Sequence, residues 1–141
     1  MDQPRFSHEI AMEVRDYECD LQGVVNNAVY LHYLEHARHQ WLVSLGLDFS
    51  ALHDQRIDLV VTRIEIDYRF PLRSGDRFAV RSFVERQGRL RTIFHQEIAR
   101  APDGKLVAQA LVTAACLQAG RPAFPAFLVE AFERAGVGGP S

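Results

Sequence analysis

Residues 27–46, NAVYLHYLEHARHQWLVSLG, decide how the chain folds. Apolar side chains recur in this stretch every three or four residues, which places them on one side of a helix. The stripe consists of Tyr30, Leu34, Ala37, Trp41 and Leu45. Asn26 or Asn27 provides an N-terminal cap, and Gly46 ends the helix. About 19 residues at 1.5 Å each give a length of about 28 Å, so we expect the rest of the domain to pack around this helix.

Four long runs of alternating apolar and polar residues follow, at 60–70, 76–86, 89–100 and 105–118. Alternation with a period of two predicts strands, and the Gly- and Pro-containing stretches between the runs predict turns. One face of the first run carries Val60, Thr62, Ile64, Ile66, Tyr68 and Phe70, and one face of the second carries Phe78, Val80, Ser82 and Val84. A shorter run at 9–16 predicts a first strand, and 124–136 predicts a terminal helix.

This order of elements predicts an α+β fold, in which a long central helix is wrapped by a curved antiparallel sheet of about five strands. We expect the four runs after the helix to form a meander. Residues 105–118 are apolar on both faces for much of their length, which favours a central strand or a subunit interface. A single domain is expected over residues 1–141, with 1–8 and 136–141 as loose tails.

The composition is that of an ordinary soluble protein, with 48% hydrophobic and 24% charged residues. We expect neither a signal peptide nor a membrane span, and Cys19 and Cys116 lack metal or redox spacing, so a cytoplasmic protein with reduced thiols is expected. The net charge is −2, and this acidic balance without a recognition helix argues against nucleic acid as a partner. Residues 59–91 are nevertheless rich in arginine, which suits either a phosphorylated or acidic partner or the solvated face of strands.

The segment from Asp16 to His39, DYECDLQGVVNNAVYLHYLEHARH, carries the candidate chemistry. Asp20 precedes Gly23 on a predicted loop, and the helix that follows presents unpaired backbone N–H groups and a positive dipole end. A thioester carbonyl bound there would be polarised, and Asp20 could attack it or activate a water molecule. Gly23 lets the loop turn and lets a substrate approach the backbone. Taken alone, an aspartate at this position is more often a turn former or a cap.

The same segment resembles the signature of the 4-hydroxybenzoyl-CoA thioesterase family of hotdog-fold enzymes. The text GVVNN followed by a small residue and an aromatic one is similar to the branch of acyl-acyl-carrier-protein thioesterases. Residues 64–76, IEIDYRFPLRSGD, also resemble the second strand of the family and the turn after it. The similarity extends over residues 10–118.

The resemblance implies a hydrolase that cleaves fatty acyl-CoA or acyl carrier protein thioesters, with Asp20 as the catalytic carboxylate and the backbone N–H of Asn27 as the oxyanion donor. It also implies homodimers joined edge to edge through their sheets, often paired into homotetramers, and no cofactor or metal. We expect the substrate to contact Gly23, Val24, Val25, Asn26 and Tyr30. Arg89 and Arg91, near a predicted turn, could bind the phosphates of coenzyme A, with Arg63 and Arg69 as alternatives.

Three other interpretations compete with this one. His32, Glu35 and His36 spell H-x-x-E-H, which resembles an inverted zinc-protease motif, but these histidines lie opposite the apolar stripe and no third ligand is evident. His95, on a predicted strand, could pair with a helix carboxylate as in hotdog dehydratases or hydratases. A non-catalytic acyl-binding module with the same fold is the third alternative.

Overall fold

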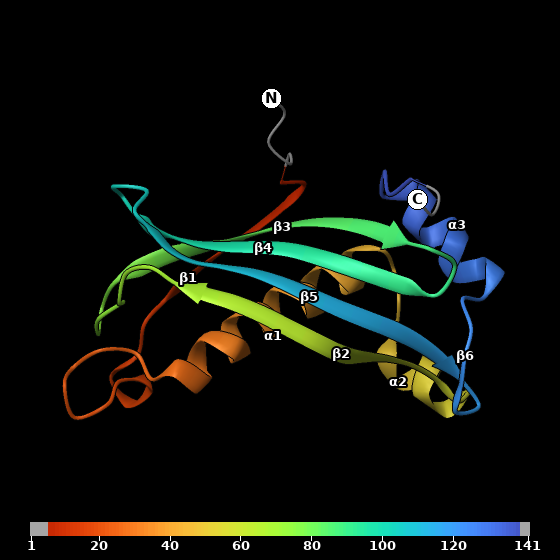
Figure 1. Cartoon of the computed structure of the whole chain (residues 1–141), viewed down its shortest axis with the longest axis horizontal. Coiled ribbons are helices and arrows are strands. Elements are labelled where there is room, and N and C mark those ends of the chain that lie inside the picture. Colours follow the sequence, from red (N-terminus) through yellow and green to blue (C-terminus); the bar gives the residue numbers. More distant parts are fainter. Residues whose placement is uncertain (1–5, 139–141) are drawn as a thin grey trace.

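The computed structural model describes residues 6–138 and consists of a curled antiparallel sheet with one long helix in its concave face (Figure 1). The sheet order is β1-β3-β4-β5-β2, and β6 extends β5 by a short pair. In chain order the elements are β1 (His8–Glu13), η1 (Asp16–Glu18), α1 (Asn27–Ser44), α2 (Phe49–Asp54), β2 (Ile57–Tyr68), β3 (Arg77–Gln87), β4 (Arg91–Ala101), β5 (Leu106–Gln118), β6 (Arg121–Pro122) and α3 (Ala126–Arg134).

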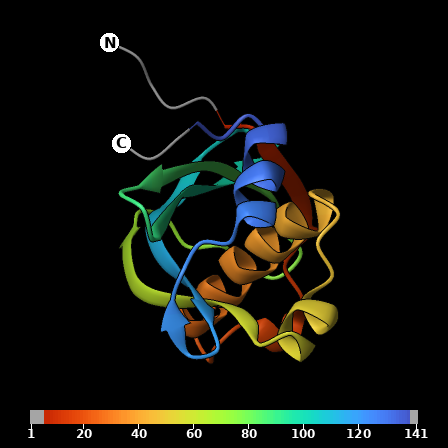
Figure 2. The same ribbon diagram turned by 90° about the vertical axis from the view of Figure 1, so that its right-hand side faces the viewer.

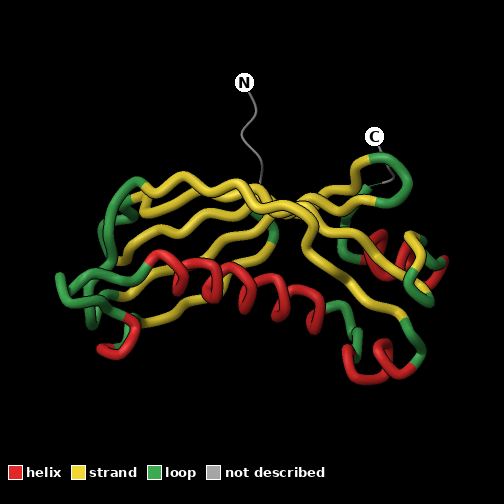
Figure 3. Tube along the Cα trace, turned by 60° about the horizontal axis from the view of Figure 1, so that its bottom comes forward, coloured by secondary structure: helices red, strands yellow, loops and turns green. Residues whose placement is uncertain are grey.

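Helix α1 lies along the inside of the sheet, as Figures 2 and 3 show from two directions. Its buried side is the predicted stripe, because Tyr30, Leu34, Ala37 and Trp41 are each no more than 4% exposed. The inner faces of the strands supply much of the rest of the core, and Leu128 and Phe132 of α3 add to it. The predicted alternation of β3 is confirmed, since all four residues of its predicted face are buried: Phe78, Val80, Ser82 and Val84. The predicted wrapping of the sheet around a central helix is therefore confirmed.

The expectation of a four-strand meander is wrong in one respect. Strands β3, β4 and β5 are connected as consecutive neighbours, but β2 pairs with β5 at the far edge and not with β3. The connection between β2 and β3 crosses the end of the sheet and is held to the start of α1, where the Val25 N–H donates to the Leu72 carbonyl at 2.9 Å. This segment therefore acts as a crossover that places β2 on an open edge.

The predicted inner face of β2 is correct for only half of the strand. A β-bulge between Val61 and Arg63 shifts the register against β5, and a bulge reverses which residues point inward. Ile64, Ile66 and Tyr68 stand opposite the buried side of β5, but beyond the bulge the inner positions are Val61, Leu59 and Ile57. Thus Val60 and Thr62 belong to the outer face.

Smaller differences concern the ends of elements. The first strand stops at Glu13, and neither α2 nor β6 was predicted from the sequence. Strand β5 has strands on both sides, as its apolar composition indicates. The expected tails, 1–8 and 136–141, are partly structured, because His8 is part of β1 and Val137 is buried against the core. Residues 1–5 and 139–141 lie outside the described residues.

Candidate active site

Asp20 occupies a short loop that folds back on itself just before α1. Its N–H donates to the Val24 carbonyl at 2.9 Å, and the Asn26 N–H donates to the Glu18 carbonyl at 3.0 Å. Cys19 and Val25 form an antiparallel bridge between these two contacts. The loop is therefore a miniature hairpin, in which Asp20 is paired with Val24 near the tip and Glu18 is paired with Asn26 at the start of the helix.

One oxygen of the Asp20 carboxylate organises this loop. Oδ1 accepts the N–H groups of Gln22 at 2.9 Å and Val24 at 3.4 Å, the arrangement of an Asx-turn. The second oxygen, Oδ2, meets no donor from the described part of the chain, and the side chain is exposed. Asp20 is thus a turn former with one carboxylate oxygen still available for chemistry.

The first turn of α1 leaves one backbone N–H group for a ligand. Asn26 is the N-cap, and its Oδ1 accepts the Ala28 N–H at 2.9 Å. The Val29 N–H donates to the Asn26 carbonyl at 2.9 Å. The N–H of Asn27, the first helical residue, meets no acceptor within residues 6–138, and Asn27 is exposed. An unpaired N–H at a helix N-terminus is a donor suited to an oxyanion.

The other predicted contacts lie around this pair but differ in accessibility. Gly23 has φ +80, which only glycine adopts readily, and a Cβ there would meet open space. Val24 is half-buried, whereas Val25 and Tyr30 are only 3% exposed. The Tyr30 hydroxyl accepts the Leu72 N–H at 3.0 Å. Tyr30 and Val25 therefore support the site from inside the core instead of facing a substrate.

Tyr68 lies next to the site, although the sequence predicts for it only a position on one face of a strand. It ends β2, is 47% exposed, and its hydroxyl donates to the Asn27 carbonyl at 3.4 Å. Its ring also packs edge-on against Tyr30, with centroids 5.5 Å apart. Tyr68 thus flanks the helix start from the sheet side. The only local signal for it is an exposed aromatic at the end of a strand, which is too common to identify a site.

Glu18 connects the Asp20 loop to the helix. Its Oε1 accepts the Arg15 N–H at 2.8 Å and the Tyr33 hydroxyl at 2.8 Å. Burial, followed by the Glu18 contact, raises the pKa of Tyr33 far above its usual range, so Tyr33 stays protonated and donates at any ordinary pH. This pair fixes the base of the loop against α1.

A groove of about 380 Å³ runs between α1 and β2 beyond the helix start. Its apolar lining includes Leu59, Val61 and Phe94. The exposed inner-face residues Ile64 and Tyr68 continue this apolar wall along β2 towards Asn27. A larger concavity of about 920 Å³ is lined by strands β2, β4 and β5 and contains none of the residues of the candidate site. The groove also lacks Asp20 and Asn27 in its lining, but it follows α1 and β2 from the second turn of the helix onward.

The arginines expected to bind phosphate are not brought to this site within one chain. Arg89 and Arg91 lie at the turn between β3 and β4, at the opposite end of the sheet from Asp20 (Figure 1). An 11-residue strand separates the two ends, which corresponds to about 35 Å. Of the alternatives, Arg63 pairs with Glu65 at 2.8 Å. Contact of Arg89 or Arg91 with a substrate at Asp20 would thus require a second chain.

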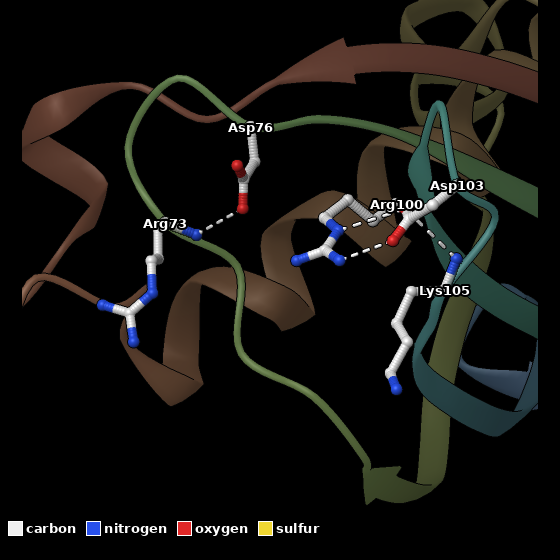
Figure 4. A network of polar contacts seen from close by, with 5 residues as sticks. All are labelled: Arg73, Asp76, Arg100, Asp103 and Lys105. Atoms are coloured by element: carbon white, nitrogen blue, oxygen red, sulfur yellow. Dashed lines mark hydrogen bonds and ion pairs between the residues drawn. The ribbon is translucent and has the colours of Figure 1, made fainter.

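Other basic residues do lie at the end of the sheet that carries Asp20. Figure 4 shows Arg73 on the connection after β2, with Arg100 and Lys105 beside the turn between β4 and β5. Arg73 forms a bridge with Val24, which is itself paired with Asp20.

These basic side chains are not equally neutralised. Asp103 accepts two hydrogen bonds from Arg100, at 3.2 and 2.5 Å, and this contact holds the pKa of Asp103 at about 2. Lys105 stacks over Phe70 at 4.9 Å. The Arg73 guanidinium has no acidic partner among the described residues. The excess of arginine is visible in the sequence, but which arginines share an end of the sheet depends on how the strands pair.

The two alternative histidine sites are not assembled in this chain. His32 and His36 are exposed on α1, and within residues 6–138 no three His, Cys, Asp or Glu side chains converge as a metal site. His95 pairs with Glu85 on the neighbouring strand, with Nε2 and Oε1 2.9 Å apart. It points to the outer face of the sheet, opposite to Gln96, which contacts α1. The carboxylate that His95 contacts is therefore on a strand, and not on a helix as the dehydratase alternative requires.

The curled sheet around one helix, with a carboxylate loop at the helix start, defines a hotdog-fold domain. A family model described as the thioesterase-like superfamily matches residues 14–132. The chain belongs to this superfamily.

Individual relatives agree with this assignment. The chain is 38% identical to the chloroplastic acyl-acyl carrier protein thioesterase ATL2 of Arabidopsis thaliana over 110 residues, which cover 78% of this chain and 58% of the relative. It is 35% identical to the long-chain acyl-CoA thioesterase FadM of Escherichia coli over 106 residues, covering 75% of this chain and 80% of the relative. The chain thus spans little more than half the length of the Arabidopsis protein.

Solved structures show the same fold. The probable thioesterase YbaW of Escherichia coli superimposes with a TM-score of 0.76 at 31% identity, over 91% of this chain and 98% of that one. The 1,4-dihydroxy-2-naphthoyl-CoA thioesterase Slr0204 of Synechocystis gives a TM-score of 0.82 at 23% identity, over 91% and 93%. At that level of identity, the second comparison supports the fold alone.

Proposed function

We propose that this protein hydrolyses fatty acyl thioesters of coenzyme A or acyl carrier protein to the free acid and the thiol. The observation that carries the proposal is the unpaired Asn27 N–H at the start of α1, at the end of the short loop on which Asp20 keeps one free carboxylate oxygen. Relatives named as acyl-CoA and acyl-acyl carrier protein thioesterases support the class of substrate.

The reaction follows from these two groups. The thioester oxygen accepts the Asn27 N–H, and the helix dipole stabilises the negative charge that develops on this oxygen. Asp20 Oδ2 either attacks the carbonyl carbon or removes a proton from a water molecule that attacks it. The C–S bond then breaks, the thiolate leaves and takes up a proton, and water supplies the hydroxyl of the acid.

The surroundings of the site accommodate the two ends of the substrate. The acyl chain occupies the groove between α1 and β2, along the apolar wall that β2 and Phe94 provide, and a neighbouring subunit covers it. The phosphate-bearing carrier extends the other way, towards the basic end of the sheet with Arg73 and Lys105. Arg89 and Arg91 take part only if the partner subunit presents them.

The structure suggests a sharp test of Asp20. Asp20→Asn keeps an oxygen for the N–H groups of Gln22 and Val24, so the loop survives, but the negative charge is lost. We expect Asp20→Asn and Asp20→Ala both to lower kcat by about 10²-fold to 10⁴-fold, with the melting temperature of Asp20→Asn close to wild type. A near-wild-type rate for Asp20→Asn would leave Asp20 as a turn residue only.

A thiol-release screen tests the function as a whole. Acyl-CoA and acyl carrier protein thioesters of graded chain length are supplied to the wild-type protein, and the released thiol is measured. The proposal expects turnover that depends on chain length. Tight, saturable binding of acyl-CoA without thiol release would instead identify a non-catalytic acyl-binding module.

We further propose that the protein acts as a homodimer or homotetramer in the cytoplasm. The exposed groove and the open edge of β2 support association, and both cysteines are free thiols. Within residues 6–138, no helix is long and apolar enough to cross a bilayer.

A further inference from the structure

Arg38 is a charged residue on the buried side of α1, where the apolar stripe would predict a hydrophobic one. Its side chain is only 7% exposed, and it lines the groove between α1 and β2. Its Nη1 donates to Gln96 Oε1 at 3.1 Å, across the interior of the domain. A guanidinium this deeply enclosed is rare unless it has an anionic partner.

The protein partner of Arg38 is neutral and rigidly held. Gln96 Nε2 donates to the Leu34 carbonyl and to Ser82 Oγ, both at 3.1 Å, so the amide oxygen is fixed towards the arginine. Within residues 6–138 no carboxylate lies at hydrogen-bonding distance from Arg38. Glu35, an exposed residue one turn earlier that lines the same groove, acts on Arg38 through its charge.

Burial also disfavours the charge of this group. Desolvation lowers the pKa of Arg38, and the charge of Glu35 opposes this only in part. The remaining guanidinium N–H groups meet no acceptor in the described part of the chain. A ligand anion in the groove would therefore replace lost hydration and supply the missing charge.

The position of Arg38 along the helix sets which part of a substrate can reach it. Gln96 joins Arg38 to the Leu34 carbonyl, so the guanidinium lies level with the turn from Leu34 to Arg38. That turn begins seven residues and ends eleven residues after Asn27, which corresponds to about 10–16 Å along the axis. The thioester end of an acyl chain is thus remote from Arg38, and its distal end is close.

We propose that Arg38 forms a polar subsite inside the acyl groove and binds a carboxylate carried by the acyl chain far from the thioester. This inference rests on the proposed thioesterase function and specifies its substrate class as acyl groups with an acidic distal end. In the strand register, Ile66 lies level with Gln96, and Tyr68 lies one inner-face position nearer to Asn27. These two side chains would contact the intervening methylenes, and the guanidinium holds the terminus as a bidentate partner.

The test compares two series of coenzyme A thioesters of graded length: monothioesters of α,ω-dicarboxylic acids and unsubstituted acyl thioesters. The quantity measured at each length is kcat/KM for the dicarboxylic monothioester divided by kcat/KM for the unsubstituted thioester. We expect this ratio to rise at least 10-fold at the length that reaches Arg38. A ratio that stays low at every length, while unsubstituted thioesters are hydrolysed, overturns the subsite alone. Absence of hydrolysis in both series overturns both the proposed thioesterase function and the Arg38 subsite.

Variants assign the effect to Arg38. Arg38→Met should abolish the maximum in the ratio, and Arg38→Lys should restore part of it because the positive charge is kept. Glu35→Gln is a second variant, which leaves the core untouched. It removes a negative charge that repels the carboxylate of the substrate, so the ratio should rise several-fold. If Arg38→Met does not fold, the Lys and Glu35→Gln variants still decide, since an unchanged ratio in both would contradict the proposal.

Discussion

At the scale of single residues, the assigned role of Asn27 belongs to its backbone, and two substitutions separate backbone from side chain. Asn27→Ala keeps the N–H, so we expect kcat/KM within a few-fold of wild type. Asn27→Pro removes the donor at the first helical position, where proline is tolerated. Asn26 already has φ −65 and ψ 141, the extended conformation that proline requires of its predecessor. We therefore expect a loss of about 10²-fold or more with little change in melting temperature.

The measurement is steady-state thiol release together with thermal unfolding of both variants. Equal rates for Asn27→Ala and Asn27→Pro, with both proteins folded, would contradict the backbone oxyanion donor. Only some of the residues at the site can be found from the sequence. Asp20 and Asn27 are neighbours in a local motif, whereas the roles of Tyr30 and Tyr68 depend on partners about 40 residues away and leave no local signal.

At the scale of elements, α1 is attached to the site loops by two tyrosine hydroxyls, and their removal should have unequal effects. Tyr33→Phe leaves Glu18 exposed enough to be solvated and retains the packing against Phe78, so we expect a loss of about 1 kcal/mol of unfolding free energy. Tyr30→Phe leaves the buried Leu72 N–H without its acceptor, and we expect the larger cost of about 1–3 kcal/mol.

Urea unfolding of the two variants checks these energies, and kcat/KM reports on the loop. Tyr33→Phe should lower kcat/KM several-fold in spite of its smaller effect on stability, because Glu18 fixes the base of the Asp20 loop. Loss of stability without loss of rate in Tyr33→Phe would show that the loop holds its conformation without this contact.

The elements themselves were largely predictable, because their periodicity is local. The stripe of α1 and the alternation of β3 follow directly from side-chain spacing. The placement of β2 in the sheet was not predictable, because an alternating run does not indicate with which strand it pairs. The bulge at Thr62 was missed for a related reason: one extra residue in an otherwise regular run has no signature in polarity. Both features are set by long-range pairing with β5.

At the scale of the whole molecule, the open side of the groove and the free edge of β2 are the same side. This arrangement explains why a strand of 12 residues at the edge of the sheet carries exposed Val61, Ile64 and Tyr68. Long edge strands with apolar side chains are a liability in a monomer. A second copy placed against β2 would cover the groove and complete the wall of the acyl site, which no inspection of one chain's sequence could establish.

We therefore expect the wild-type protein to sediment as a dimer or a tetramer, and the β2 edge to determine this. Ile64→Lys places a charge on the inner side of that edge and should raise the dissociation constant of the dimer at least 10-fold, which corresponds to about 1.4 kcal/mol. Leu90→Lys is the matched control, since Leu90 is similarly exposed, at 43% against 38% for Ile64, but lies at the turn between β3 and β4.

Sedimentation velocity over a concentration series measures the dissociation constants of both variants. Activity should fall with the fraction of dimer in Ile64→Lys and stay unchanged in Leu90→Lys, because only the first substitution opens the acyl groove to water. A fully active wild-type monomer would show instead that one chain encloses its substrate alone.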